Sequence, residues 1–254
     1  MLFRIAIGFV VGTLVGLTGL GGGVLLLPLL IFGLGVAPIV AVGSDAVFNS
    51  VTKLGSGLMH WKQRTVDWGL VAALVSGSIP ASIAGVAVLA YLRRSYGSGV
   101  NDFLKLVVGF LLVVIPVFLV LQGQLKAHDV KAEPSRTGYR WQVVAIGAVA
   151  GFLVGMTSIG SGTITMMFLF LLFPYSPVLI IGTDIVHAVL LTGFTSLLHL
   201  RLGTVDPILA ITLLAGSIPG SLLGTKLSTY VPGYWLKRVL CGLLFVTGAR
   251  MILL

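Results

Sequence analysis

The sequence predicts an all-α polytopic membrane protein with about eight hydrophobic segments in two homologous halves. The first observation is composition: 57% of the 254 residues are hydrophobic and 9% are charged, whereas a soluble domain carries about 25% charged residues. The second is that apolar stretches of about 20 residues, long enough to cross a bilayer, recur along the whole chain. The third is an internal repeat. Together they indicate a multi-pass membrane protein.

The repeat has a constant offset of 139 residues. Without a gap, residues 6–85 align with residues 145–224 and share 29 identities over those 80 positions. A repeat of this kind predicts two equivalent structural units. We therefore divide the chain into a first membrane repeat, a polar connector and a second membrane repeat, at residues 1–122, 123–140 and 141–254. The basic residues of the connector place it in the cytoplasm.

Each half begins with an apolar segment that glycines interrupt and continues with three plainer apolar spans. The interrupted segments cover about residues 5–33 and 143–173. The plainer spans cover about residues 38–60, 68–91 and 103–122, then 177–200, 207–229 and 235–254.

The interrupted segments are open to two interpretations. The part after the glycines has about ten residues, too few to cross a hydrocarbon core of about 30 Å. Each interrupted segment is therefore either a broken helix that crosses the membrane or a hairpin that returns to its own side. Crossing segments give parallel repeats and returning segments give inverted repeats. Loop charges do not distinguish the two, but short glycine-broken segments at matching positions favour inverted repeats.

The two glycine clusters read GLTGLGGGVLLLP at 16–28 and GMTSIGSGTITMM at 155–167. Irregular backbone at membrane depth is tolerated only inside the protein or beside a wet cavity. A helix that restarts after such a cluster offers free N–H groups and the positive end of its dipole to an anion. Gly12 and Gly151, outside the clusters, are typical of close helix packing. The predicted substrate-binding residues here are Thr18, Gly21, Gly22, Gly23, Thr157, Gly160, Ser161 and Gly162.

Ionisable side chains inside the apolar spans are the next candidates, because charge at membrane depth is costly and usually functional. Asp45 and Lys53 lie on a polar stripe at helical spacing, and the aligned span carries Asp184 and His187. We expect Asp45, Asp184 and His187 to couple protons, and Ser44, Thr183 and Lys53 to bind substrate. Lys53 lies about 12 Å along the helix from Asp45, so Asp184 is its more plausible partner.

Several polar residues also have a structural interpretation. Ser44-Asp45 and Thr183-Asp184 are typical of caps on helices that start within the membrane. Asp67 and Asp206 follow Thr-Val at the start of a span and are predicted helix caps. His60 and His199 close their spans, which favours a position at the membrane interface or beside a helix C-terminus.

Other functions find no support in the sequence. The net charge of +9 does not indicate nucleic acid, because the basic residues lie between apolar spans, as in loops facing anionic lipid. Cys241 is the single cysteine, so no cysteine-built metal site is expected. HExxH, GxSxG and Walker motifs are absent. We therefore expect no enzyme, no cofactor and no resident metal, and the expected partners are the lipid bilayer and a small-molecule anion.

The motifs taken together resemble the sulfite exporter TauE/SafE family over nearly the whole chain. The resemblance rests on GLTGLGGGVLLLP, GSD at 43–45 and TVD at 65–67, with GMTSIGSG, GTD and TVD in the second half. It implies an inner-membrane transporter that exports sulfite, sulfonates or other small organic anions. The chain departs from the family pattern in two ways. Its GSD and GTD motifs, which we call the GxD boxes, both end in aspartate, and Met167 stands at the position aligned with Pro28. The acidic pair suggests a cation or proton partner.

We therefore expect a secondary transporter that exports a small sulfur-containing or organic anion with proton coupling. One alternative is a transition-metal or other cation permease that uses the Asp and His stripes as ligands. Another is a passive anion channel, which would need no titratable pair. The sequence does not specify the oligomeric state.

Overall fold

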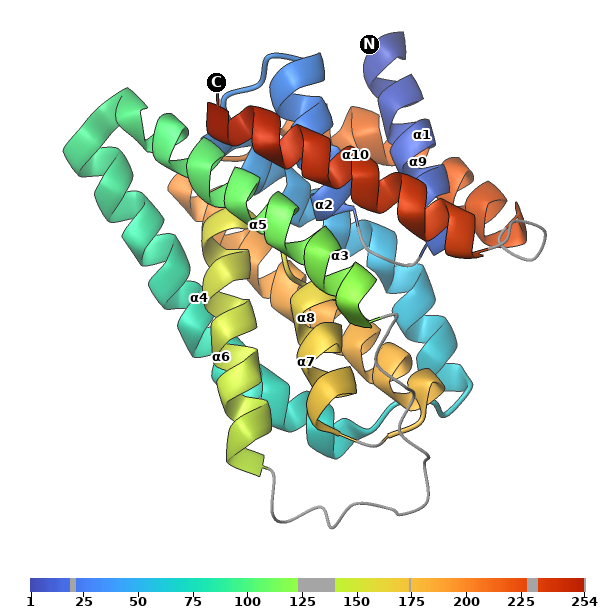
Figure 1. The fold of residues 1–254 in the computed structure, drawn as a ribbon. Coiled ribbons are helices and arrows are strands. Elements are labelled where there is room, and N and C mark those ends of the chain that lie inside the picture. Colours follow the sequence, from blue (N-terminus) through green and yellow to red (C-terminus); the bar gives the residue numbers. More distant parts are fainter. Residues whose placement is uncertain (19–21, 123–139, 174, 228–232, 254) are drawn as a thin grey trace.

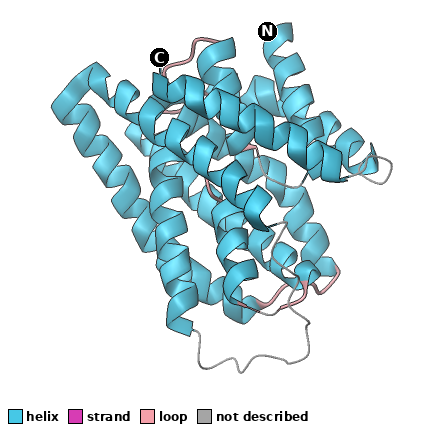
Figure 2. Ribbon diagram, viewed as in Figure 1, coloured by secondary structure: helices cyan, strands magenta, loops and turns pink. Residues whose placement is uncertain are grey.

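The computed structural model describes residues 1–18, 22–122, 140–173, 175–227 and 233–253, and every regular element in these ranges is helical (Figure 2). The first half contains α1 (Leu2–Thr18), α2 (Gly23–Pro28), the π-helical turn η1 (Leu29–Gly33), α3 (Pro38–Lys62), α4 (Trp68–Tyr96), the 3₁₀ turn η2 (Gly97–Gly99) and α5 (Val100–Gln122). The second contains α6 (Arg140–Thr157), α7 (Thr163–Leu172), α8 (Pro177–Leu202), α9 (Pro207–Leu227) and α10 (Gly233–Leu253). The predicted all-α class is confirmed. Connector residues 123–139 lie outside the described residues, and Arg140 already begins α6.

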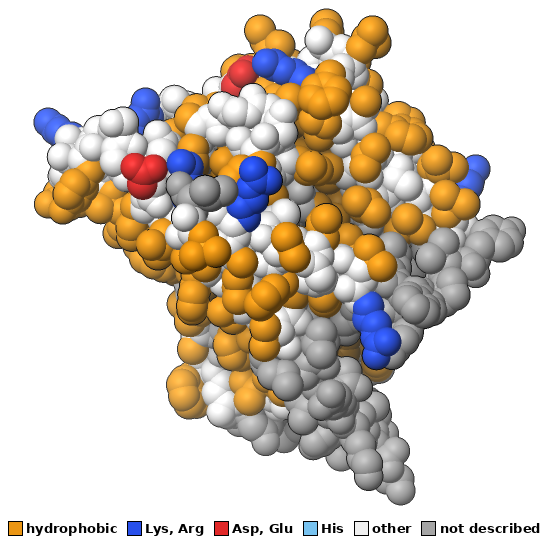
Figure 3. Space-filling model, turned by 45° about the horizontal axis from the view of Figure 1, so that its top comes forward, with side chains coloured by type: hydrophobic (Ala, Val, Ile, Leu, Met, Phe, Trp, Pro, Cys, Tyr) orange, Lys and Arg blue, Asp and Glu red, His pale blue; other side chains and the backbone are white. Residues whose placement is uncertain are grey.

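Several described stretches are long and apolar enough to cross a membrane. Four meet this condition, at Trp68–Val117, Arg140–Thr157, Pro177–Leu202 and Pro207–Gly224, and shorter apolar helices lie at Leu2–Leu17, Gly23–Gly33 and Thr163–Leu172. Helix α3 has 25 residues but is not among them, because Asp45, Asn49 and Lys53 lower its hydropathy. The face shown in Figure 3 is mostly hydrophobic, with a few separated basic side chains.

The first helix of each half packs against the third long helix of the other half. Helix α1 lies along α9 and α6 lies along α4, while α3 packs on α8 and α5 on α10 (Figure 1). Glycines bring these helices into backbone contact: Gly12 lies on the backbone of Ser217, and Gly151 lies on that of Ser78. The two contacts are related by the repeat offset, so the packing is reciprocal. The halves thus interlock, and the prediction of close packing at these glycines is confirmed.

Both interrupted segments change direction at their glycine clusters. In Figure 1, α1 descends from the N-terminus and α2 with η1 leads back upwards, whereas α6 ascends and α7 descends. The chain then enters α3 and α8 through prolines at the first helical position, Pro38 and Pro177, where the missing N–H has no intrahelical partner to lose.

The predicted helix caps are right at one pair of positions and wrong at another. Asp67 accepts hydrogen bonds from the N–H groups of Gly69 and Leu70, and Asp206 accepts one from Leu209 at 3.0 Å. The capping interpretation of Ser44-Asp45 and Thr183-Asp184 is wrong. Since α3 and α8 begin at their prolines, both pairs lie well inside a continuous helix.

The reciprocal packing predicts that Gly151→Leu and Gly12→Leu destabilise the protein equally, by about 3 kcal/mol, because the added side chain would enter the facing backbone. Unfolding in detergent micelles, followed by circular dichroism during titration with sodium dodecyl sulfate, measures the effect. Gly55→Leu is the matched control, since a Cβ at Gly55 meets nothing within 4 Å. Equal stabilities of all three variants would contradict the packing.

Candidate functional site

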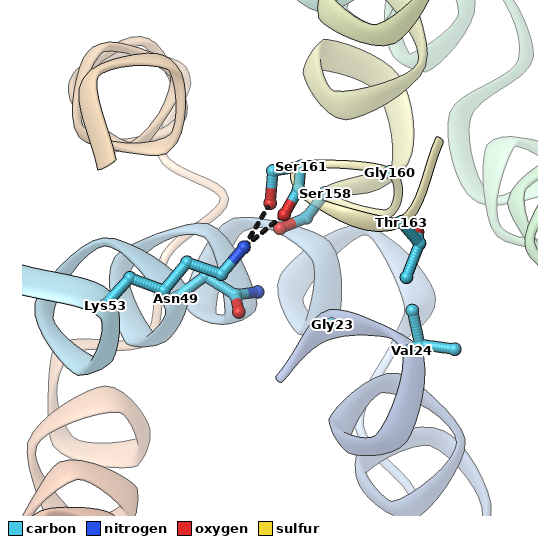
Figure 4. A pocket seen from close by; sticks show the side chains of 8 residues that line it. All are labelled: Gly23, Val24, Asn49, Lys53, Ser158, Gly160, Ser161 and Thr163. Atoms are coloured by element: carbon cyan, nitrogen blue, oxygen red, sulfur yellow. Dashed lines mark hydrogen bonds between the residues drawn. The ribbon is translucent and has the colours of Figure 1, made fainter. Parts of the chain in front are cut away.

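The two glycine clusters meet inside the protein. A Cβ on Gly23 would lie 2.9 Å from the carbonyl oxygen of Ser158, at the end of α6. Between the clusters is a narrow space, too tight for a water molecule in this conformation (Figure 4), lined by Gly23, Val24, Asn49, Lys53, Ser158, Gly160, Ser161 and Thr163. We refer to this space as the cluster pocket.

The loop between α6 and α7, residues 158–162, has an unusual backbone. Ser158, Gly160 and Gly162 have φ angles of 59°, 109° and 125°, in a region that favours glycine. The Gly162 N–H donates to the Gly160 carbonyl at 2.8 Å. This tight turn lets α7 begin at Thr163 beside the pocket, where the first N–H groups of a helix have no intrahelical acceptor.

Lys53 reaches from the first half to the cluster of the second. Its side chain is buried, and the Nζ donates to the carbonyl oxygen of Ser161 and to the Ser161 hydroxyl, the latter at 3.1 Å (Figure 4). A Cβ on Gly162 would lie 3.2 Å from this Nζ and 3.3 Å from Oδ2 of Asp184. Lys53 thus approaches Asp184, as the sequence predicted.

Asn49 holds the cluster of the first half. Its Oδ1 accepts a hydrogen bond from the Gly22 N–H at 2.8 Å, and its Nδ2 donates to Oδ2 of Asp45 at 2.8 Å. The sequence analysis did not select Asn49 as a site residue. Its signal was the spacing of one helical turn from both Asp45 and Lys53, which places all three on one helix face. Helix α3 therefore contacts both clusters.

Three predicted substrate residues have hydroxyls that bond to backbone groups. The hydroxyl of Ser44 accepts from the Asp206 N–H and that of Thr183 from the Asp67 N–H, each at 3.0 Å. These bonds hold the Thr-Val-Asp turn of the other half. Thr157 donates to the Leu153 carbonyl and accepts from the Ile159 N–H. Gly21 lies outside the described residues, and so does the side chain of Thr18.

The histidines lie in separate places. Buried His187 has Nε2 2.9 Å from the Ser78 hydroxyl, while its Nδ1 has no partner. His199, in the last turn of α8, is also buried and contacts the Gly155 carbonyl at 3.1 Å, so of its two predicted places the one beside a helix C-terminus agrees with the structure. Because α6 ends at Thr157 and the Ile159 N–H donates to the Thr157 hydroxyl, the Gly155 carbonyl is left for His199. His60, 2.8 Å from the Thr65 hydroxyl, is half-buried. Among the described residues, no three His, Cys, Asp or Glu side chains gather as metal ligands.

Several buried polar atoms near the clusters lack a hydrogen-bond partner. They include Oδ1 of Asp45, both carboxyl oxygens of Asp184, and the hydroxyls of Ser158, Thr163 and Thr165. Buried polar groups are normally hydrogen-bonded, because a buried donor or acceptor without a partner lowers the stability of the fold by about 1–3 kcal/mol. Unmet groups beside a pocket are typical of a site that exchanges a ligand.

Comparison with known proteins agrees with this arrangement. Residues 4–251 match the model of the family described as sulfite exporter TauE/SafE. The "Probable membrane transporter protein YjnA" of Bacillus subtilis (strain 168) is 38% identical over 98% of this chain and 98% of its own length. YunE of the same organism, which has the same description, is 28% identical over 98% and 96%.

A further relative is named for a substrate. The "Probable sulfite/organosulfonate exporter TauE" of Cupriavidus necator is 27% identical over 93% of this chain and 87% of its own length. No solved structure matches the chain. The family consists of membrane transporters and not of enzymes, and its multi-pass character fits the apolar helices described above. With a family match that spans both glycine clusters and nearly the whole sequence, the chain belongs to the sulfite exporter TauE/SafE family.

Proposed function

We propose that the protein is a secondary transporter that exports a small anion of the sulfite or sulfonate type through the cluster pocket. The observation that carries this proposal is the buried ammonium of Lys53 at the point where the two glycine clusters meet. A cation at membrane depth needs a negative partner. The hydroxyls of Ser161 and Thr163 supply further donors. The substrate class follows the name of the Cupriavidus necator relative.

Proton coupling follows from charge balance around the pocket. With Lys53 charged and both Asp45 and Asp184 ionised, the three groups carry one net negative charge, which would repel an anion. Uptake of one proton removes that repulsion. Asp45 is the better proton carrier, because its hydrogen-bond donor is the neutral amide of Asn49, whereas Asp184 lies beside the Lys53 ammonium. His187, one turn beyond Asp184, is a second candidate.

The unpartnered carboxylate oxygens favour one other function, a cation permease. Against it, each of the three histidines in the spans has its own hydroxyl partner away from the pocket. The Asp and His stripes therefore do not converge on one ion. A passive anion channel would not require two buried carboxylates beside the permeant anion.

We also propose that the halves, residues 1–122 and 141–254, are inverted repeats of four segments each, joined by a cytoplasmic connector at 123–140. The reversal of chain direction at both clusters supports segments that return to their own side (Figure 1). The reciprocal glycine contacts support a two-fold relation between the halves. Three crossings then separate the N-terminus from the connector.

Inverted repeats predict that Leu2 and Gln63 lie on opposite sides of the membrane. In a Cys241→Ala background, Leu2→Cys should react with a membrane-impermeant maleimide in intact cells, and Gln63→Cys only after the cells are permeabilised. Arg201→Cys should behave like Leu2→Cys. If Leu2→Cys and Gln63→Cys react from the same side, the interrupted segments cross the membrane and the repeats are parallel.

Replacing the pocket cation should weaken anion binding. We expect Lys53→Met to reduce sulfite affinity by at least about tenfold, because a charge-assisted hydrogen bond is worth about 1.5–3 kcal/mol. Isothermal titration of the purified protein measures the affinity. Arg94→Met is the matched control, since Arg94 is exposed in the last turn of α4. Equal affinities for the two variants would show that Lys53 has a structural role.

The two aspartates should differ in their effects. Asp45→Asn should abolish sulfite transport driven by a pH gradient in proteoliposomes but preserve exchange of internal for external sulfite. Asp184→Asn should impair binding or folding, because it leaves the Lys53 ammonium buried without a nearby negative charge. Full pH-driven accumulation by Asp45→Asn would refute its assignment as proton carrier.

A further inference from the structure

The two clusters present the same arrangement with different chemistry. Beside the Cβ position of Gly23 lie Oδ2 of Asp45 at 2.8 Å and Nδ2 of Asn49 at 3.1 Å. Beside that of Gly162 lie Nζ of Lys53 at 3.2 Å and Oδ2 of Asp184 at 3.3 Å. Each aspartate thus faces a nitrogen donor, neutral in the first half and charged in the second. Asp45 therefore has a neutral hydrogen-bond donor where Asp184 has a charged group beside it.

The second oxygen of Asp45 faces the other half of the protein. Its Oδ1 has no hydrogen-bond partner, and neither has the hydroxyl of Ser158, which faces the same carboxyl group. Both side chains are almost fully buried, at 0% and 1% exposure. The Ser158 carbonyl oxygen also points to this place, 2.9 Å from the Gly23 Cβ position. An ionised carboxylate and a carbonyl only accept hydrogen bonds, whereas a serine hydroxyl can donate or accept one. Ser158 can therefore bond the Asp45 carboxyl group in either of its protonation states.

Ser158 is also an unusual residue for its backbone. Its φ of 59° lies in the left-handed region, which costs a residue with a Cβ about 1 kcal/mol or more. The aligned position in the first half is Gly19, the residue type that avoids this cost. A serine at such a position is explained if its hydroxyl is used.

We propose that Ser158 is the hydrogen-bond partner of the coupling proton on Asp45. The proton binds to Oδ1 of the carboxylate, and the resulting O–H donates to the Ser158 hydroxyl oxygen. Oδ2 continues to accept from Asn49. When the proton leaves, the carboxylate charge returns, and the Ser158 hydroxyl reverses its role and donates its own hydrogen to Oδ1. This inference rests on the proposed function and specifies where its proton binds.

The bond would join the two halves across the wall of the cluster pocket. Asp45 belongs to α3, and Ser158 belongs to the loop that leads into α7. The direction of this bond between the halves therefore changes at the moment when the net charge near the pocket becomes suitable for an anion.

Few other titratable groups lie near Asp45. Lys53 is on the same helix, and Asp184 and His187 are on α8. Helix α2 and the 158–162 loop contribute none. Helices α5 and α9 also pack on α3. Their charged side chains lie near the helix ends, at Asp102 and Lys105 in α5 and at Lys226 in α9.

The test variant is Ser158→Gly, which removes the hydroxyl and suits the left-handed backbone. Arg64→Gly is the matched control, because Arg64 also has a positive φ, 57°, and lies in an exposed turn. In proteoliposomes we expect Ser158→Gly to keep exchange of radiolabelled sulfite but to lose about tenfold in accumulation driven by a pH gradient, the equivalent of one buried hydrogen bond. Arg64→Gly should match the wild type in both assays.

Infrared difference spectra between acidic and neutral pH give a readout that does not depend on transport. The carboxyl C=O band that disappears in Asp45→Asn should shift in Ser158→Gly and stay in place in Arg64→Gly. An unshifted band, or full pH-driven accumulation by Ser158→Gly, would overturn the inference while leaving the transport function intact. Sulfite uptake driven by a sodium gradient alone, and lost in Ser158→Gly, would overturn it by assigning the site to a metal cation. Absence of sulfite exchange by the wild type would instead refute the proposed function, and the infrared result would still decide the role of Ser158.

Discussion

Backbone polar groups inside a membrane must find partners within the protein, since lipid offers none. Two helix breaks at membrane depth therefore create the need that organises this fold. Asn49 accepts from the Gly22 N–H, Lys53 donates to the Ser161 carbonyl, and His199 contacts the Gly155 carbonyl. These side chains come from α3 and α8, the two long helices that pack on each other at the centre of the molecule. The polar stripes of these helices are thus explained first by the broken backbone.

The same requirement distinguishes polar residues that hold the fold together from those that line the pocket. Hydroxyls of the GxD boxes, Ser44 and Thr183, bind backbone N–H groups at the turns of the opposite half. Outlying glycines such as Gly12 and Gly151 let helices of different halves touch. The breaks at the clusters bring glycines and hydroxyls to one small space instead. Residues of similar type therefore have different roles, which depend on whether a backbone group or an open space faces them.

Function depends on where the symmetry fails. The repeat gives each half a glycine beside an aspartate, but Asn49 and Lys53 align with Ala188 and Thr192. Helix α3 therefore serves both clusters, while α8 contributes Asp184 and His187. An exactly symmetric site would treat its two carboxylates alike. A single lysine makes one of them its neighbour and leaves the other with a neutral amide, and the proposed proton coupling rests on this difference.

The sequence by itself determined the membrane class, the two repeats, the positions of the helices within a few residues and the caps at Asp67 and Asp206. These follow from local features: composition, span length, repeat offset and the short-range bonding of a cap. The sequence could not show that Ser44 and Thr183 bind the opposite half, that His199 is buried, or that Ser158 lies close to Asp45. Each of these depends on residues more than 40 positions apart that only the packing of the halves brings together. Tertiary structure decided them because a hydrogen-bond partner is fixed by direction and distance in space, and a polar pattern along one helix specifies neither.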